Sequence, residues 1–318
     1  MDKEHWFKIA CYLDGQGGCT PFDSGDELQS ERTHWVHLDY TQQQSTAWMH
    51  ANKVPERVIE ALTASETRPR ASEVAGGLLV YLRGVNLQPG ARPEDMIALR
   101  LWLGPNGVIS TQKRTLLTVE TVETDLLQGE GVHSSTALVA RLVDELTWRM
   151  EDVIENLETE VESCAEQLEA SPTASLTAQL SLLRRRAITL RRYLAPQREA
   201  LSKLQTDRMF TDADVMQIRE ASDRLLRLVE DLDAAREHAT LLQEEVFAVQ
   251  NEAINDRMYL LAIISALFLP LGFLTGLFGI NVGGLPGVEN EKAFWWFCAG
   301  MSVIAFGVVI WMRKRRWF

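Results

Sequence analysis

The chain has 318 residues, of which 46% are hydrophobic, and a formal net charge of −12 at pH 7. This acidic balance argues against nucleic acid as a partner, because phosphate binding calls for a basic face. An acidic surface instead concentrates cations. The four cysteines have no CxxC spacing, so we expect neither a structural zinc knuckle nor paired disulfides.

Residues 1–130 are expected to form a cytoplasmic α/β domain, within an α+β fold for the soluble part as a whole. Apolar runs bounded by glycine or proline predict strands at Trp6–Leu13, Thr33–Tyr40, Glu73–Val85, Asp95–Leu103 and Val108–Arg114. Between the second and third of these strands, Thr41–Leu62 predicts a helix, with a second helical piece that begins near Pro55.

Residues 131–210 are expected to form a helical hairpin, because an acidic helix is followed by a basic one. The acidic side chains are Glu151, Asp152, Glu155, Glu158, Glu160, Glu162, Glu166 and Glu169. The basic ones are Arg184, Arg185, Arg186, Arg191, Arg192 and Arg198. Opposite charges favour an antiparallel hairpin with complementary flanks, although two solvated faces of unrelated helices remain the alternative.

Residues 211–257 are expected to form a stalk helix, since apolar residues recur there with alternating spacings of three and four. The residues of this heptad seam are Leu225, Leu228, Leu232, Ala235, Ala239, Leu242, Val246, Val249 and Ala253. A heptad seam requires a partner helix in the same register. A helix that continues into the membrane would be roughly 100 Å long at about 1.5 Å per residue. Because one protomer could not bury so long a seam, the pattern predicts self-association around an axis.

Residues 258–318 are expected to form the transmembrane part. Two uncharged apolar runs, 258–278 and 294–312, are each close to the roughly 20 residues that span a lipid bilayer as a helix. The short loop 279–293 joins them, and the basic tail Arg313–Arg316 follows the second run. The positive-inside rule then places both termini in the cytoplasm and only the short loop outside.

Polar and small residues mark one face of the first run, and we interpret this stripe as a continuation of the heptad seam. Its members are Asn255, Met258, Leu261, Ala262, Ser265, Leu269, Gly272, Thr275, Gly276 and Gly279. Polar groups in hydrocarbon usually face a bundle interior or a wet cavity. Small residues also let helices pack closely. The spacing alone therefore predicts pore lining and helix packing equally well.

The stripe ends in a motif that resembles a known family. Gly279-Ile280-Asn281 is similar to the Gly-x-Asn signature, usually Gly-Met-Asn, that closes the first span of the CorA superfamily of divalent-cation channels. The sequence Val282-Gly-Gly-Leu-Pro-Gly287 that follows looks like the ZntB branch, which is associated with zinc. Three soluble segments also resemble that branch: Thr67–Arg70, Gly77–Asn86 and Pro93–Met96. The resemblance covers essentially the whole chain.

This resemblance implies a funnel-shaped homopentamer in the bacterial inner membrane, whose first span lines a pore and whose second span faces lipid. Gly279, Ile280 and Asn281 match the selectivity mouth, and the stripe matches the pore-lining positions. Met258 and Leu261 fall where the family narrows hydrophobically. Ile280 replaces the methionine of magnesium-transporting members, so the resemblance favours zinc as the transported ion. No cofactor is expected.

The chemistry of the mouth suits a hydrated divalent ion. A ring of Asn281 side chains would offer oxygens that bind the ion through its tightly held water. Glu289 and Glu291 would enrich cations at the entrance, unless they form only a solvated turn. The stripe contains neither cysteine nor histidine, the ligands that zinc prefers, so zinc selectivity follows from the resemblance and not from ligand chemistry.

The sequence also suggests where a regulatory metal ion could bind and where transport could be coupled to protons. Glu155, Glu158, Glu162, Glu166 and His238 are candidates for a cytoplasmic regulatory metal site, with a solvated face as the alternative. His34 and His37 are expected to point to opposite faces of a strand and so not to share a metal. Between Met258 and Ile280 there is no Asp, Glu, His, Lys or Arg, so we expect no side-chain proton relay along this helix. Any coupling to protons would act at the mouth or in the cytoplasmic funnel.

No phosphate-binding loop or nucleophile elbow indicates an enzyme. Two alternatives to zinc transport stay open. One is a membrane-anchored coiled-coil sensor or scaffold, and the other is a magnesium or cobalt channel of the same superfamily.

Overall fold

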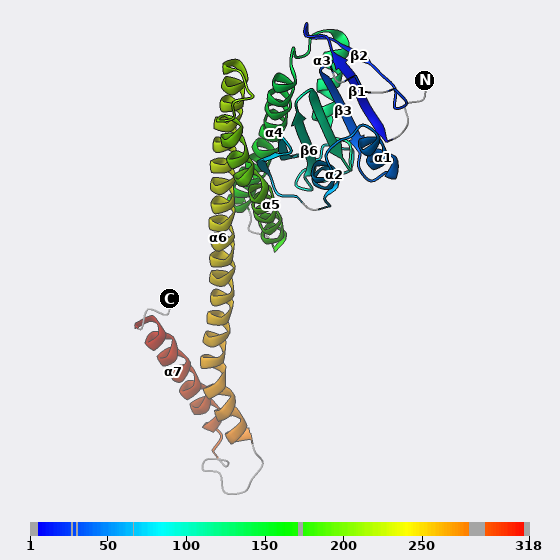
Figure 1. Cartoon of the computed structure of the whole chain (residues 1–318). Coiled ribbons are helices and arrows are strands. Elements are labelled where there is room, and N and C mark those ends of the chain that lie inside the picture. Colours follow the sequence, from blue (N-terminus) through cyan, green and yellow to red (C-terminus); the bar gives the residue numbers. More distant parts are fainter. Residues whose placement is uncertain are drawn as a thin grey trace. The chain divides into compact units, whose positions relative to one another are not determined.

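The computed structural model in Figure 1 describes residues 6–26, 28–29, 31–65, 67–170, 174–279 and 290–314. Its contacts divide the chain into two compact units, Met1–Glu244 and Glu245–Phe318. The described strands are β1 Phe7–Leu13, β2 Cys19–Pro21, β3 His34–Asp39, β4 Arg70–Val74, β5 Gly77–Gly84, β6 Ile97–Gly104 and β7 Gly107–Gln112. The described helices are α1 Gln43–Ala51, α2 Glu56–Thr63, α3 Leu117–Gln128, α4 Ser135–Ala170, α5 Ala174–Leu204, α6 Asp212–Gly279 and α7 Ala293–Lys314. The α+β class is therefore confirmed.

The seven strands form one mixed sheet with the order β2-β1-β3-β7-β6-β5-β4. Only β3 and β7 pair in parallel, and every other neighbouring pair is antiparallel. The prediction of a single strand over Glu73–Val85 was wrong, because β4 and β5 form a hairpin there. Its turn holds Ala75 and Gly76 at φ values of 52° and 75°. Strand β2 and helix α3 were not predicted at all.

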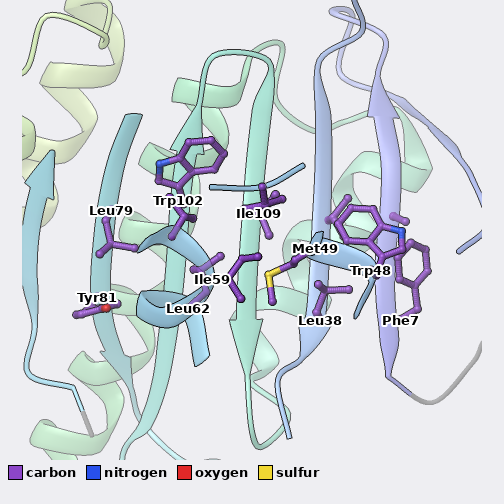
Figure 2. Packing of buried hydrophobic residues seen from close by; sticks show 14 residues of the cluster. Phe7, Leu38, Trp48, Met49, Ile59, Leu62, Leu79, Tyr81, Trp102 and Ile109 are labelled. Atoms are coloured by element: carbon purple, nitrogen blue, oxygen red, sulfur yellow. The ribbon is translucent and has the colours of Figure 1, made fainter. Parts of the chain in front are cut away.

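The core of the sheet lies on both of its faces. Figure 2 shows side chains of α1 and α2, among them Met49 and Ile59, lying over the face that carries Leu38, Leu79 and Ile109. The alternate residues of the same strands are also buried, for example Leu78, Val80, Leu82, Leu101 and Val108. Helices α4 and α5 pack against β4, β5 and β6. Burial on both faces explains why these strands read as nearly continuous apolar runs.

A buried histidine interrupts the apolar core in β3. The Nδ1 atom of His37 lies 2.7 Å from Ser110 Oγ, which also accepts a hydrogen bond of 2.9 Å from Trp35 Nε1. Burial lowers the pKa of His37 to about 4. His34 lies on the other face of β3, where its Nδ1 is 3.3 Å from the carbonyl oxygen of Arg32. The two histidines therefore cannot share a metal ion.

The depressed pKa of His37 makes the stability of the soluble unit depend on pH. The unfolded chain takes up a proton near pH 6.5, whereas the folded chain does so only near pH 4. We therefore expect the free energy of unfolding to fall by about 3 kcal/mol as the pH drops from 6.5 to 4. Thermal unfolding of the detergent-solubilised protein across this range should measure the loss. The difference in Tm between wild type and His37→Phe should change with pH, and a constant difference would contradict the assignment.

Helices α4 and α5 pack together and lie beside the N-terminal part of α6 (Figure 1). Arg186 Nη1 lies 2.7 Å from Glu160 Oε2, an ion pair between the basic and acidic helices of the hairpin. Arg191 Nε of α5 lies 2.7 Å from Asp233 Oδ1 of α6. The seam residues Leu225, Leu228, Leu232, Ala235, Ala239 and Leu242 are at most 7% exposed. The argument that a single protomer cannot bury the seam was therefore wrong for residues 225–242, which α4 and α5 of the same chain cover, whereas Val249 and Ala253 at the end of the seam are exposed.

A reciprocal cap starts α6 and ties it to α4. Asp214 Oδ2 accepts hydrogen bonds from Thr211 N at 3.1 Å and from Thr136 Oγ1 at 2.8 Å. Thr211 Oγ1 in turn accepts one from Asp214 N at 3.3 Å. This capping box satisfies backbone N–H groups that the first turn would otherwise leave unpaired. The same carboxylate therefore begins the long helix and joins it to the start of α4.

Candidate ion pathway

The second unit consists of the C-terminal part of α6 and α7. In the described part of the chain, these two helices are long and apolar enough to cross a membrane, with mean hydropathies of 2.3 and 2.0 in their most apolar windows. The rings of Phe278 and Phe297 pack edge to face with centroids 5.3 Å apart. The partly buried residues of α6 in this region are Ile263, Leu267, Pro270, Leu271 and Leu274. At about 100° per residue they fall on one face of the helix, which is the face toward α7.

The predicted pore stripe lies on the opposite face of α6. Averaged over its members from Met258 to Gly279, its direction is about 180° from that of the partly buried residues. Every member of the stripe is exposed in the protomer, with Met258 at 65% and Leu269 at 78%. No described residue of the second unit therefore covers the stripe.

Hydroxyl and amide groups on this face offer oxygen atoms. Thr275 Oγ1 donates back into the helix, 3.0 Å from the carbonyl oxygens of Leu271 and Gly272. Its hydroxyl hydrogen is thereby satisfied, while its lone pairs stay available to water. Asn255 and Ser265 are exposed on the same side. Such oxygens can hydrogen-bond the water shell of a cation without replacing it.

The stripe does not continue the heptad seam, which corrects the sequence interpretation. Ala253, the last seam residue, and Asn255, the first stripe residue, are two positions apart and hence about 200° apart around the helix. The seam residues up to Leu242 face α4 and α5, whereas the stripe begins on a different side of α6. The exposure of the stripe is therefore an independent observation and not a consequence of the seam.

The predicted mouth lies mostly outside the described residues. Gly279 is the last residue of α6, and Glu291 is exposed in the turn that precedes α7. Ile280, Asn281 and Glu289 lie outside the described part, so the amide ring and half of the acidic entrance stay predictions.

Helix α7 presents large apolar side chains on the face away from its partly buried stripe. Trp295, Trp296, Val303, Phe306 and Ile310 are all more than half exposed there. This composition suits contact with lipid, because bulky apolar and interfacial aromatic residues are favoured at that boundary.

The candidates for a regulatory metal site are only partly brought together. Glu155 and Glu158 of α4 line a cavity of about 530 Å³ together with Glu230 and Asp231 of α6. Burial and repulsion from Asp231 and nearby acidic residues raise the pKa of Glu158.

Arg224 and Arg227 line the same cavity and give it a mixed charge, whereas Glu162, Glu166 and His238 do not line it. Within the ranges that the structure describes, no three histidine, cysteine or acidic side chains are arranged to hold a metal ion. The structure therefore does not assemble the regulatory site that we expected.

A soluble α+β unit, a long helix that becomes apolar and a second apolar helix together give the architecture expected of a membrane protein. The family model described as "CorA-like Mg2+ transporter protein" matches residues 30–314. The chain belongs to this family.

Similar proteins cover the chain almost completely. The zinc transport protein ZntB of Pectobacterium carotovorum subsp. carotovorum (strain PC1) is 35% identical over 320 residues, which cover 99% of this chain and 98% of that protein. The structure of the full-length CmaX protein matches with a TM-score of 0.86 and 36% identity, covering 99% of both chains. The CorA magnesium transporter of Methanocaldococcus jannaschii matches with a TM-score of 0.83 at 18% identity, covering 98% of this chain and 99% of that one. At that identity the last match supports the fold alone.

Proposed function

We propose that the chain transports zinc, and to a lesser degree other divalent cations, through a central pore lined by the stripe of α6. The pore would be closed at its outer end by Gly279, Ile280 and Asn281. The protein would act as a homopentamer in the bacterial inner membrane, with both termini in the cytoplasm. In this proposal residues 1–130 and the hairpin 131–210 form the cytoplasmic part, residues 211–257 the stalk, and residues 258–318 the membrane part.

The single observation that carries this proposal is the placement of the stripe on α6. Polar and small residues lie on the face opposite α7, and none of the residues described in their own unit covers them. Exposing amides and hydroxyls to lipid is unfavourable, so this face calls for copies of itself or for water. Membership in the CorA-like family supports contact with water, in a pore formed between copies of the chain. The identity of 35% to a protein named as a zinc transporter supports zinc as the ion.

The same substitution, made once on α6 and once on α7, tests whether the stripe lines the pore. Ser265→Phe would place a ring at the centre of the proposed pore in each copy, so we expect zinc flux into liposomes to fall at least tenfold. Ser302→Phe adds the same ring to an exposed position of α7, and its flux should stay near wild type. Isotopic zinc uptake measures both variants, and a chromatographic mass in detergent checks assembly. Equal flux through both variants would show that this face of α6 does not line the pathway.

A magnesium or cobalt channel is the second candidate, favoured by the description of the family model itself. Competition of each unlabelled ion against isotopic zinc, in the same liposomes, separates the two. If magnesium displaced zinc at equal concentration, the chain would be a general divalent-cation channel. If wild type passed no divalent ion at all, the membrane-anchored scaffold would be favoured instead.

A further inference from the structure

Four arginine side chains lie close enough to interact electrostatically, and two of them contact Tyr193 of α5: Arg83, Arg100, Arg114 and Arg192. Arg83 Nη1 lies 3.2 Å from the carbonyl oxygen of Met96, and Arg114 Nη2 lies 3.4 Å from the same oxygen. Arg83 Nη2 also donates to the carbonyl oxygen of Thr67 at 2.8 Å. A shared acceptor places the guanidinium groups of Arg83 and Arg114 next to each other.

A tyrosine on α5 joins a third arginine to this pair. The guanidinium carbons of Arg83 and Arg192 each lie 4.7 Å from the ring centroid of Tyr193. Arg192 Nη2 also lies 2.7 Å from Tyr193 Oη. Three cations therefore surround one carbonyl and one ring. Cation–π contact stabilises such a group only modestly.

The fourth arginine is buried without a full set of partners. The side chain of Arg100 is 2% exposed, and its Nε and Nη1 atoms have no hydrogen-bond partner. Its Nη2 lies 3.3 Å from Tyr40 Oη and 3.4 Å from the carbonyl oxygen of Ser65, and its guanidinium carbon lies 4.3 Å from the centroid of the Tyr40 ring. A buried cation without a counter-charge is unfavourable, so this arrangement calls for negative charge nearby.

No carboxylate supplies that charge within the part of the chain that the structure describes. None of the four guanidinium groups has an oxygen of a described Asp or Glu within 4.0 Å, although Arg141, Arg149 and Arg224 elsewhere in the same unit each do. Burial, and repulsion from the other three arginines, lower the pKa of Arg83, while Tyr193 opposes the shift. The chain as a whole has a net charge of −12, so this cluster is opposite in sign to the average of the molecule.

We propose that this arginine cluster binds an anion of the phosphate class at the junction of α5 and the sheet. Guanidinium groups match the oxygens of phosphate in paired, charge-assisted hydrogen bonds. Arg114 and Arg192 are exposed and would contact the anion, whereas Arg83 is partly buried, Arg100 is buried, and both would add positive charge. The phosphate could be free or belong to a nucleotide, since both present the same oxygens.

A bound anion would strengthen the contact between β5 and α5, and α5 is in turn joined to α6. The Arg83 backbone N–H donates to Gln197 Oε1 of α5 at 2.7 Å, so the bound anion would reinforce an existing contact between α5 and β5. The ion pair between Arg191 and Asp233 then joins α5 to α6. The proposed site would let an anion bind to a protein whose proposed cargo is a cation. The site does not depend on which cation is transported.

The test uses the full-length protein in detergent and buffers freed of divalent cations. Sodium phosphate, pyrophosphate and ATP are titrated separately against chloride at constant ionic strength, with calorimetric binding and Tm as readouts. We expect a saturable rise in Tm with at least one phosphate compound and none with chloride. Arg114→Gln combined with Arg192→Gln should weaken that binding about tenfold or more.

The matched control is Arg184→Gln combined with Arg185→Gln, which makes the same change of charge at exposed positions of α5. This variant should bind like wild type. Tighter binding of ATP than of inorganic phosphate would identify a nucleotide, and the reverse order would identify free phosphate. Absence of saturable binding in wild type, or equal weakening in both double variants, would overturn the proposal.

Discussion

Asn281→Ala is expected to reduce zinc flux into liposomes by at least tenfold. The proposed mouth holds one amide from each copy, and the substitution removes all of these oxygens together. Each hydrogen bond to a charged group contributes roughly 1.5–3 kcal/mol, and a loss of about 1.4 kcal/mol already corresponds to a factor of ten. The loss of even part of the ring should therefore be measurable as flux of isotopic zinc.

The control for this experiment is Asn290→Ala, the same substitution nearby in sequence. Asn290 Oδ1 accepts a hydrogen bond of 2.9 Å from Lys292 N just before α7, so this change should disturb only a local turn. Flux through Asn290→Ala should remain close to wild type. If Asn281→Ala conducted as well as wild type while its assembly was intact, the mouth would have to lie elsewhere.

Arg224→Ala is expected to lower the free energy of unfolding of the soluble unit by about 3 kcal/mol. Arg224 is 9% exposed and joins α6 to α4, with Nη1 2.9 Å from Asp144 Oδ1 and 3.1 Å from Thr147 Oγ1. Its guanidinium carbon also lies 3.9 Å from the ring centroid of Trp148. Arg141 Nη1, 3.7 Å from the other oxygen of Asp144, would still offset part of the carboxylate's charge, which keeps the loss at the lower end for a broken buried pair.

Chemical denaturation of the detergent-solubilised protein would measure this change. Arg227→Ala removes an exposed arginine one turn away and should alter stability by no more than about 0.5 kcal/mol. Arg224→Lys keeps the charge but loses the planar fork, so it should fall between wild type and Arg224→Ala. Equal stabilities for Arg224→Ala and Arg227→Ala would show that the network contributes nothing.

Several features could be predicted from the sequence because they depend on local patterns. The apolar runs at 258–278 and 294–312 predicted two membrane-length helices, and α6 and α7 contain them. The stripe of polar and small residues depends only on helical periodicity, so its members could be chosen before the position of α7 was known. The break near Pro55 likewise separates α1 from α2, because proline ends one helix and can begin another.

Other features depend on which segments meet. The heptad seam specified that α6 needs a partner helix but not which one, and α4 and α5 of the same chain take that place. The strand predicted over Glu73–Val85 is a hairpin, because the run of apolar residues does not reveal the turn at Ala75 and Gly76. The arginine cluster could not be predicted, since Arg83 and Arg192 are far apart in sequence.

By itself, then, the sequence determined the periodic elements of this protein: a long helix that runs into the first of two apolar segments, the second apolar segment, and a stripe of polar and small residues on the first. Periodicity carries that information because it belongs to single helices and strands. Only the tertiary structure decided which helix faces are buried inside the protomer and which are exposed. It assigned the seam to α4 and α5 and left the stripe from Met258 to Gly279 uncovered, because burial depends on contacts between segments that are distant along the chain.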